Sequence, residues 1–216
     1  MPGRLKHDYL VIEGNIGTGK TSLATKISGQ FNSRLILERF ADNPFLPKFY
    51  ENQQRYAFPL ELSFLADRYQ QLSDDLKNQD LFQQQTVSDY ILSKSLIFAA
   101  ITLKEDEFDL YQRLFHIINP HLPKPDLIVY LHKDVTELQQ NIRKRGRDYE
   151  QNIRDEYLAS LESGYWKFFK SQPGLKILVI DTNNVDFIEN NKHYEGILEL
   201  INQDYAPGIH RVLLDS

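Results

Sequence analysis

Tyr9-Leu10-Val11-Ile12, followed after Glu13 by Gly14-Asn15-Ile16-Gly17-Thr18-Gly19-Lys20-Thr21, is the stretch that decides the fold. The apolar segment predicts a buried strand, and the second segment matches the Gly-x-x-x-x-Gly-Lys-Ser/Thr pattern of a phosphate-binding loop. Glycines let backbone N–H groups wrap a phosphate, and a helix starting near Lys20 adds its positive dipole end. Lys20 and Thr21 would reach phosphate oxygens and Mg²⁺. The chain is therefore expected to bind a nucleoside triphosphate.

The composition limits the class of protein further. With 216 residues the chain is expected to form one α/β domain over 1–216. Its 25 basic and 30 acidic residues argue against binding to nucleic-acid polymers or anionic membranes. The absence of cysteine excludes disulfides and thiolate chemistry. No signal-like or membrane-spanning apolar run is present, so a cytoplasmic location is expected.

Short, continuous apolar runs alternate with longer amphipathic stretches. Continuous runs indicate strands covered on both faces, so the sequence predicts a five-stranded parallel sheet with helices on either side. The predicted strands are Leu10 to Ile12, Leu35 to Leu37, Thr86 to Ser88, Leu127 to Leu131 and Ile177 to Ile180. The predicted helices are Thr21 to Phe31, Leu60 to Lys77, Ser93 to Ala99, Asp106 to Ile118, Val135 to Lys144, Arg154 to Phe169 and Tyr194 to Ile201.

The phosphate-binding loop leaves three classes open: a switch GTPase, an assembly ATPase and a small-molecule kinase. A guanine-reading Asn-Lys-x-Asp is missing, because Asn191-Lys192-His193-Tyr194 lacks the aspartate. The fourth apolar run ends in His132-Lys133 instead of the acidic residue usual in assembly ATPases. The basic cluster Arg143-Lys144-Arg145-Gly146-Arg147 suits a lid that stabilises charge on a moving phosphoryl group. A solvated helix end is the alternative interpretation of this cluster.

Five segments in order, covering about Tyr9 to Ile201, resemble the deoxynucleoside kinases. The Asp42-Asn43-Pro44 string and Ser88-Asp89-Tyr90 resemble the bacterial deoxyguanosine and deoxyadenosine kinase branch. The segments are Gly14 to Thr21, Glu38 to Leu46, Phe64 to Tyr69, Leu96 to Ala99 and Lys144 to Glu150. The resemblance implies a P-loop kinase fold with a short arginine-rich lid at about 143–152. Asp42, before Asn43-Pro44, is expected to be a structural turn residue.

The resemblance also implies the catalytic residues. Glu38 follows the second strand, where the family places the carboxylate that takes the proton of the nucleoside 5′-hydroxyl. Lys20, Arg145 and Arg147 correspond to the groups that stabilise the transferred phosphate. An arginine that relatives often carry four residues before Arg145 is replaced by Asn141, with Arg143 nearby.

Glu61 and Arg68 lie seven residues apart in a predicted helix, about 10 Å along one face. The resemblance places a base-reading residue at Glu61, where many relatives carry glutamine. An ionised glutamate only accepts hydrogen bonds, which suits the N1–H and 2-amino donors of guanine, whereas O6 needs a donor such as Arg68. Lys94 is expected to add positive charge near O6 or N7. An exposed Glu61–Arg68 pair is the plainer alternative.

Other contacts come from the resemblance alone. Phe98 matches an aromatic that stacks on the base, although a core phenylalanine would look the same. Tyr50 and Glu150 match the residues that hold the sugar 3′-hydroxyl. The run ending in Asp186-Phe187 resembles the loop around the adenine of the phosphate donor.

The chain departs from the family at Ser88-Asp89-Tyr90, where most relatives have an acid followed by arginine. This removes a positive charge near Glu38. Asp89 has two possible roles, either acting through water on a Mg²⁺ that Thr21 binds or holding Arg68 or Lys94.

The activity expected from the resemblance is Mg-ATP-dependent phosphorylation of a purine deoxynucleoside in salvage, with deoxyguanosine favoured, by a homodimer. The alternatives are a deoxyadenosine or broad deoxynucleoside kinase, a nucleoside monophosphate kinase, and a non-catalytic nucleotide-binding protein.

Overall fold

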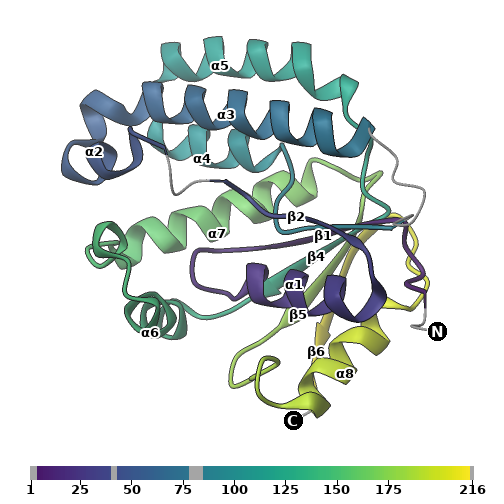
Figure 1. The fold of residues 1–216 in the computed structure, drawn as a ribbon. Helices are drawn as coiled ribbons and strands as arrows, with labels where there is room; N and C mark the ends of the chain where they lie inside the picture. Colours follow the sequence, from purple (N-terminus) through teal and green to yellow (C-terminus); the bar gives the residue numbers. More distant parts are fainter. Residues whose placement is uncertain (1–3, 40–42, 78–84, 215–216) are drawn as a thin grey trace.

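A single parallel sheet forms the centre of the protein. The computed structural model describes residues 4–39, 43–77 and 85–214, and Asp42 therefore lies outside the described residues. Six strands are arranged in the order β2-β3-β1-β4-β5-β6, and every neighbouring pair is parallel (Figure 1). The strands are β1 (Tyr9–Gly14), β2 (Arg34–Ile36), β3 (Thr86–Ser88), β4 (Leu127–His132), β5 (Lys176–Asp181) and β6 (Gly208–Leu213).

The predicted parallel sheet is confirmed, but the predicted number of five strands is wrong. The sixth strand, β6, pairs with β5 from Lys176↔Gly208 to Asp181↔Leu213. Its residues alternate between half-buried and exposed, whereas β1 is buried along its whole length. An edge strand needs no continuous apolar run, and the sequence of β6 includes His210 and Arg211. A search for continuous apolar runs therefore misses it.

The helices agree closely with the predicted ones. They are α1 (Lys20–Phe31), α2 (Leu46–Glu51), α3 (Gln53–Lys77), α4 (Lys94–Thr102), α5 (Glu105–Ile118), α6 (Val135–Arg145), α7 (Asp155–Lys170) and α8 (Asn191–Ile201), with the 3₁₀ turns η1 (Asn119–His121) and η2 (Asp148–Glu150). Helix α2 was not predicted, and α3 begins seven residues before the predicted Leu60. Pro59 lies inside α3, whereas proline ordinarily marks the first turn of a helix.

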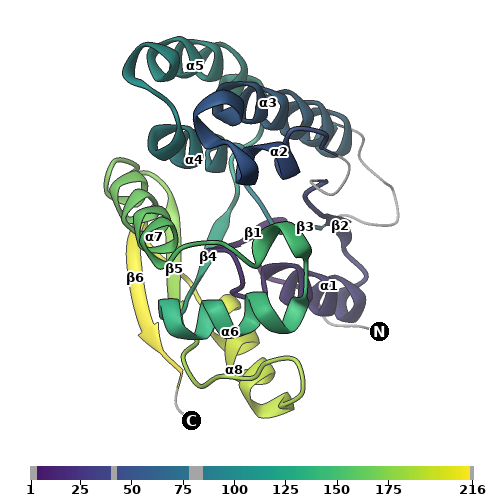
Figure 2. The same cartoon turned by 90° about the vertical axis from the view of Figure 1, so that its left-hand side faces the viewer.

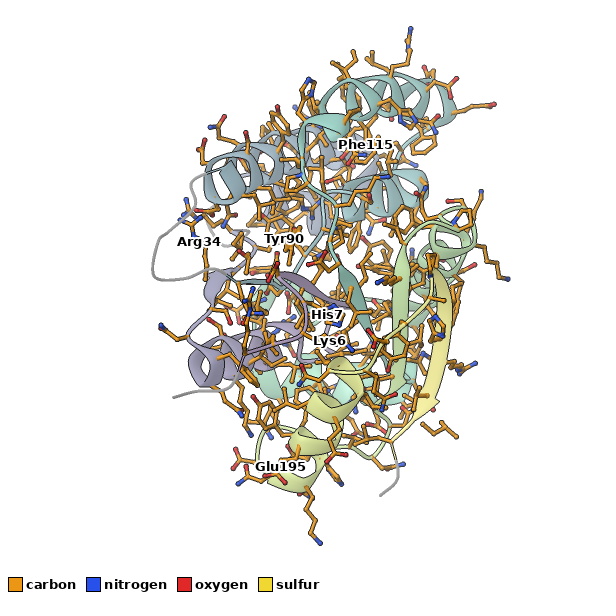
Figure 3. All side chains as sticks on the ribbon, turned by 90° about the vertical axis from the view of Figure 1, so that its right-hand side faces the viewer. Lys6, His7, Arg34, Tyr90, Phe115 and Glu195 are labelled. Atoms are coloured by element: carbon orange, nitrogen blue, oxygen red, sulfur yellow. The ribbon has the colours of Figure 1, made fainter. Side chains whose placement is uncertain are left out.

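Helices cover both faces of the sheet (Figures 1 and 2). On one face α1 and α8 bury Leu23, Ile27 and Ile197 against the strands. On the other face α4 and α7 lie on the sheet, and Tyr165 and Phe169 of α7 pack there. Helices α3 and α5 pack beyond α4 around a separate apolar cluster, which includes the labelled Tyr90 and Phe115 of Figure 3. None of the described helices is long and apolar enough to cross a membrane.

The strand order brings three polar segments together. Strand β1 ends at Gly14, where the phosphate-binding loop begins, and its two neighbours in the order are β3 and β4. Glu38 follows β2, and Asp89 follows β3 directly. Because the carboxyl ends of parallel strands meet at one edge of a sheet, these segments line a common crevice.

The contact between α4 and α7 supports one wall of this crevice, and it depends on Gly164. A Cβ atom added there would lie 3.0 Å from Cγ2 of Ile97 and 3.3 Å from Cδ1 of Ile101. We expect Gly164→Val to lower the free energy of unfolding by about 1–3 kcal/mol through overpacking. Urea denaturation measures this, with Gly29→Val as the matched control, because Gly29 is helical and has nothing within 4 Å of its added Cβ. Equal stability of the two variants would contradict the close approach.

Candidate active site

The loop between β1 and α1 has the geometry of a phosphate cradle. Gly17 and Gly19 both have φ of 90°, a conformation that favours glycine. An added Cβ on Gly17 would lie 2.9 Å from the carbonyl oxygen of Leu138, and one on Gly19 would lie 2.9 Å from Cζ of Phe187. Helix α1 begins at Lys20, so its N-terminal N–H groups face the loop.

Two side chains brace the loop. Lys20 Nζ donates to the carbonyl oxygen of Asn15 at 2.8 Å. Asn141, which stands where relatives often have arginine, donates its Nδ2 to the carbonyl oxygen of Gly17 at 2.8 Å. Asn141 thus supports the loop from α6, a role that the sequence analysis did not identify.

Glu38 lies between two buried cations. Arg68 Nη2 of α3 lies 2.6 Å from Glu38 Oε1, and Lys94 Nζ of α4 lies 2.5 Å from Glu38 Oε2. Burial alone would raise the pKa of this carboxyl, but Lys94 and Arg68 outweigh it and lower the pKa to about 2. Glu38 is therefore ionised throughout the physiological range.

Asp89 connects Glu38 to the phosphate-binding loop. Its Oδ1 accepts the backbone N–H of Glu38 at 2.8 Å, and its Oδ2 accepts the hydroxyl of Thr21 at 2.5 Å. No hydrogen bond from Arg68 or Lys94 to Asp89 is found among the described residues, since both cations turn to Glu38. Two roles were considered for Asp89: acting on a Mg²⁺ bound by Thr21, or holding Arg68 or Lys94. The contact with Thr21 favours the first.

Glu61 is a buried carboxylate with an unused acceptor. The residue is 2 % exposed, its Oε1 accepts from the hydroxyl of Thr102 at 3.0 Å, and its Oε2 has no partner among the described residues. Burial raises the pKa of Glu61 to about 7, against the opposing effect of Arg68. The pocket therefore holds two carboxyls with very different proton affinities.

Arg68 pairs with Glu38, and its charge also acts on Glu61. Its Nε also donates to Glu38 Oε1, at 2.8 Å, and its Nη1 donates to the hydroxyl of Ser95 at 2.8 Å. Together with the Nη2 contact, these bonds use three of the five guanidinium N–H groups. The guanidinium lies 4.7 Å from the ring centroid of Phe64 and 6.0 Å from that of Phe98. It can still donate to a ligand held against Phe98.

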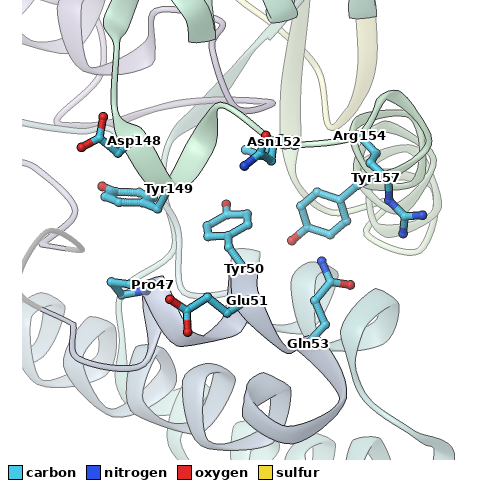
Figure 4. Close-up of a pocket in the computed structure, with 10 residues that line it drawn as sticks. Pro47, Tyr50, Glu51, Gln53, Asp148, Tyr149, Asn152, Arg154 and Tyr157 are labelled. Carbon is cyan, nitrogen blue, oxygen red and sulfur yellow. The ribbon is translucent and has the colours of Figure 1, made fainter.

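The end of α6 and the segment that follows it line one side of the pocket. Arg145 Nη2 bonds to Glu150 Oε2, and Arg147 Nη1 lies 3.2 Å from Glu150 Oε1. Gly146 between the arginines has φ of 70° and ends α6. The rings of Tyr50 and Tyr149 stack with centroids 6.0 Å apart, and Figure 4 shows them beside Tyr157 in a hollow adjoining the pocket. The stacked rings connect α2 to this segment.

One pocket brings together most of the predicted site residues. Its lining includes Ile16, Lys20, Thr21, Glu38, Tyr50, Glu61, Arg68, Asp89, Lys94, Phe98, Arg145, Arg147 and Glu150. The predicted residues that do not line it are Gly14, Asn15, Gly17, Thr18, Gly19, Asp186 and Phe187. Phe187 nevertheless lies against Gly19 on the other side of the loop.

Five apolar or aromatic lining residues were not predicted as site residues: Leu46, Phe49, Leu60, Phe64 and Tyr157. Phe64 lies three residues after Glu61 and four before Arg68. Helical spacing could therefore have placed it on the same face. Tyr157 belongs to α7, and nothing in the local sequence connects it to this pocket.

Comparison with known proteins identifies relatives over nearly the whole chain. The family model described as deoxynucleoside kinase matches residues 10–205. Deoxyguanosine kinase of Bacillus subtilis is 38 % identical over 193 residues, covering 88 % of this chain and 93 % of the relative. Deoxyadenosine/deoxycytidine kinase of the same organism is 25 % identical over 203 residues, covering 91 % and 92 %.

A solved structure shares the fold. Deoxyadenosine kinase from M. mycoides with bound dATP superposes with a TM-score of 0.77 at 22 % identity, covering 90 % of this chain and 98 % of that chain. The arrangement of sheet and helices is therefore that of a deoxynucleoside kinase structure.

The raised pKa of Glu61 makes stability depend on pH. Between pH 4.5 and about 7 the folded state binds more protons at Glu61 than the unfolded state does, so this residue's stabilising contribution is lost as the pH rises. Wild type should therefore lose stability relative to Glu61→Gln over this range, with a slope of at most about 1.4 kcal/mol per pH unit. Urea denaturation at several pH values measures the difference, and a constant difference would contradict the raised pKa of this buried carboxyl.

Proposed function

The chain belongs to the deoxynucleoside kinase family, and we propose that it transfers the γ-phosphoryl group of ATP to the 5′-hydroxyl of purine deoxynucleosides, with deoxyguanosine preferred. The observation that carries the base preference is the unpartnered Oε2 of the buried Glu61. The similarity to the deoxyguanosine kinase of Bacillus subtilis supports the same preference.

Glu38 is the proposed acceptor of the hydroxyl proton. The 5′-oxygen bonds to the γ-phosphorus while the bond from that phosphorus to the β,γ-bridging oxygen breaks, and the hydroxyl proton passes to Glu38. With a pKa of about 2, Glu38 is a weak base. In a loose transition state the hydroxyl keeps its proton until the new bond is well formed, so a weak but well-placed acceptor suffices.

Guanine suits the Glu61 end of the pocket. An ionised Glu61 offers acceptors only, which match the adjacent N1–H and 2-amino donors of guanine. The N–H groups of Arg68 that its bonds to Glu38 and Ser95 do not use are the proposed donors to O6. Two good hydrogen bonds to the ionised carboxylate would also offset the cost of its burial.

The sugar and the phosphates occupy the other parts of the pocket in this proposal. Tyr50 and Glu150 hold the 3′-hydroxyl, and residues 143–152 act as the lid. Arg145 and Arg147 both contact Glu150, so the sugar-binding acid and the lid arginines share one cluster. Lys20 holds the donor phosphates, and Asp186-Phe187 borders the donor base, with Phe187 against Gly19.

Mg²⁺ fits the oxygen ligands beside the loop. The Thr21 hydroxyl and Asp89 carboxylate lie 2.5 Å apart, and Mg²⁺ in kinases takes one or two protein oxygens besides phosphate oxygens. No cluster of three or more acidic, histidine or cysteine residues suited to a metal occurs in the described part of the chain. When bound, Mg²⁺ supplies positive charge to the phosphate oxygens.

A homodimer and a cytoplasmic location are also proposed. The exposed face of α5 supports the dimer, because Leu110 is 42 % exposed and Ile117 is 65 % exposed. Both residues lie in α5, seven positions apart, and therefore share one face of the helix.

The base preference is tested by changing Glu61. Glutamine offers one donor and one acceptor, which suits adenine and fails to match two guanine donors. For Glu61→Gln we expect the ratio of kcat/KM for deoxyguanosine to that for deoxyadenosine to fall about 10²-fold. Steady-state kinetics with Mg-ATP measures the ratio, and the exposed Glu105→Gln is the matched control. An unchanged ratio in Glu61→Gln would contradict the proposed reading of guanine.

A further inference from the structure

Lys94 forms a direct ion pair with the proposed proton acceptor. Its Nζ lies 2.5 Å from Glu38 Oε2, and its side chain is 7 % exposed. The ring centroid of Phe98 lies 5.4 Å from the same Nζ. The expectation that Lys94 reads the base does not account for this direct ion pair.

The two oxygens of Glu38 have separate cationic partners. Arg68 holds Oε1 through Nε and Nη2, and Lys94 alone among the described residues holds Oε2. Removing Lys94 would leave Glu38 tied through one oxygen and free to rotate about that attachment. The second cation therefore fixes the plane of the carboxylate as well as its charge.

The protein backbone sets the position of Lys94 independently of any ligand. Lys94 begins α4, and its N–H donates to the carbonyl oxygen of Ile91 at 3.0 Å. The N–H of Ile91 in turn donates to Oε1 of the buried Glu13 at 3.0 Å. Glu13 directly precedes Gly14, where β1 ends and the phosphate-binding loop begins, so Lys94 and the loop share one support.

We propose that Lys94 is a positioning residue that orients the Glu38 carboxylate for phosphoryl transfer. This role rests on the proposed function. It also bears on Ser88-Asp89-Tyr90, where most relatives have an arginine. Tyr90 is fully buried, and its hydroxyl donates to Gln71, so this segment supplies no positive charge to Glu38. Lys94, at the start of α4, supplies that charge instead.

A positioning role and a base-reading role differ in what they change. A group that acts through Glu38 affects the common chemical step of every deoxynucleoside, whereas a group that contacts the base changes the preference among bases. We expect Lys94→Met to lower kcat about 10²-fold for both deoxyguanosine and deoxyadenosine, because a misplaced reacting group costs about this much. The two KM values and the ratio of kcat/KM between the substrates should change less than about threefold.

A double-mutant cycle with Glu38→Gln separates this role from a general structural one. If Lys94 acts through Glu38, the double variant Glu38→Gln/Lys94→Met should be about as active as Glu38→Gln alone. Independent, multiplicative losses would overturn the proposal. Lys94→Arg keeps the positive charge and should recover kcat to within about tenfold of wild type, so an Arg variant as inactive as Lys94→Met would also count against it.

The controls keep the outcomes separate. Lys6→Met removes a lysine whose Nζ also lies 2.5 Å from a carboxylate, that of the exposed Asp204, and it should retain wild-type kinetics. Thermal unfolding of each variant verifies folding, and Lys94→Arg still tests the proposal if Lys94→Met does not fold. A wild-type protein that phosphorylates no deoxynucleoside would defeat the proposed function itself. An active wild type with a changed base preference in Lys94→Met would defeat only the role of Lys94.

Discussion

The ionised Glu38 carboxylate, held between Arg68 and Lys94, is the interaction on which the rest of the site depends. Its three charged groups are almost fully buried, with side-chain exposures of 10 %, 4 % and 7 %. A buried charge is tolerated only where it is paired and hydrogen-bonded, so each member requires the others. Asp89 accepts hydrogen bonds from the backbone of Glu38 and from the hydroxyl of Thr21. These bonds fix the position of the cluster relative to the phosphate-binding loop.

The same pocket shifts the pKa values of two carboxyls in opposite directions. Near its two cations Glu38 has a pKa of about 2, whereas Glu61, buried with a single hydroxyl donor, has a pKa of about 7. Titratable groups whose environments push their pKa values apart commonly have different roles. In this account Glu38 accepts a proton during transfer, and Glu61 reads the base once ligand donors stabilise its ionised form.

Continuous apolar runs and the phosphate-binding loop were enough to predict the parallel sheet, because both depend on local sequence. Buried strands need apolar residues, and the loop needs glycines at positive φ. Strand β6 was not predicted because half of its residues face solvent, and α3 extends N-terminally past Pro59, although proline ordinarily marks the first turn of a helix. The pocket residues were largely anticipated, yet the pairing of Lys94 with Glu38 was not, since it joins residues 56 positions apart. Tyr157 was also missed, because the tertiary packing of α7 decides which of its side chains reaches the pocket.

The most direct test of the account is a competition assay. Purified protein is given Mg-ATP with an equimolar mixture of the four natural deoxynucleosides and guanosine, and the monophosphates are separated by chromatography. We expect dGMP as the main product, with little GMP. Predominance of dAMP or dCMP would contradict the assignment of Glu61 and Arg68 to guanine, and no monophosphate at all would contradict the proposed kinase activity.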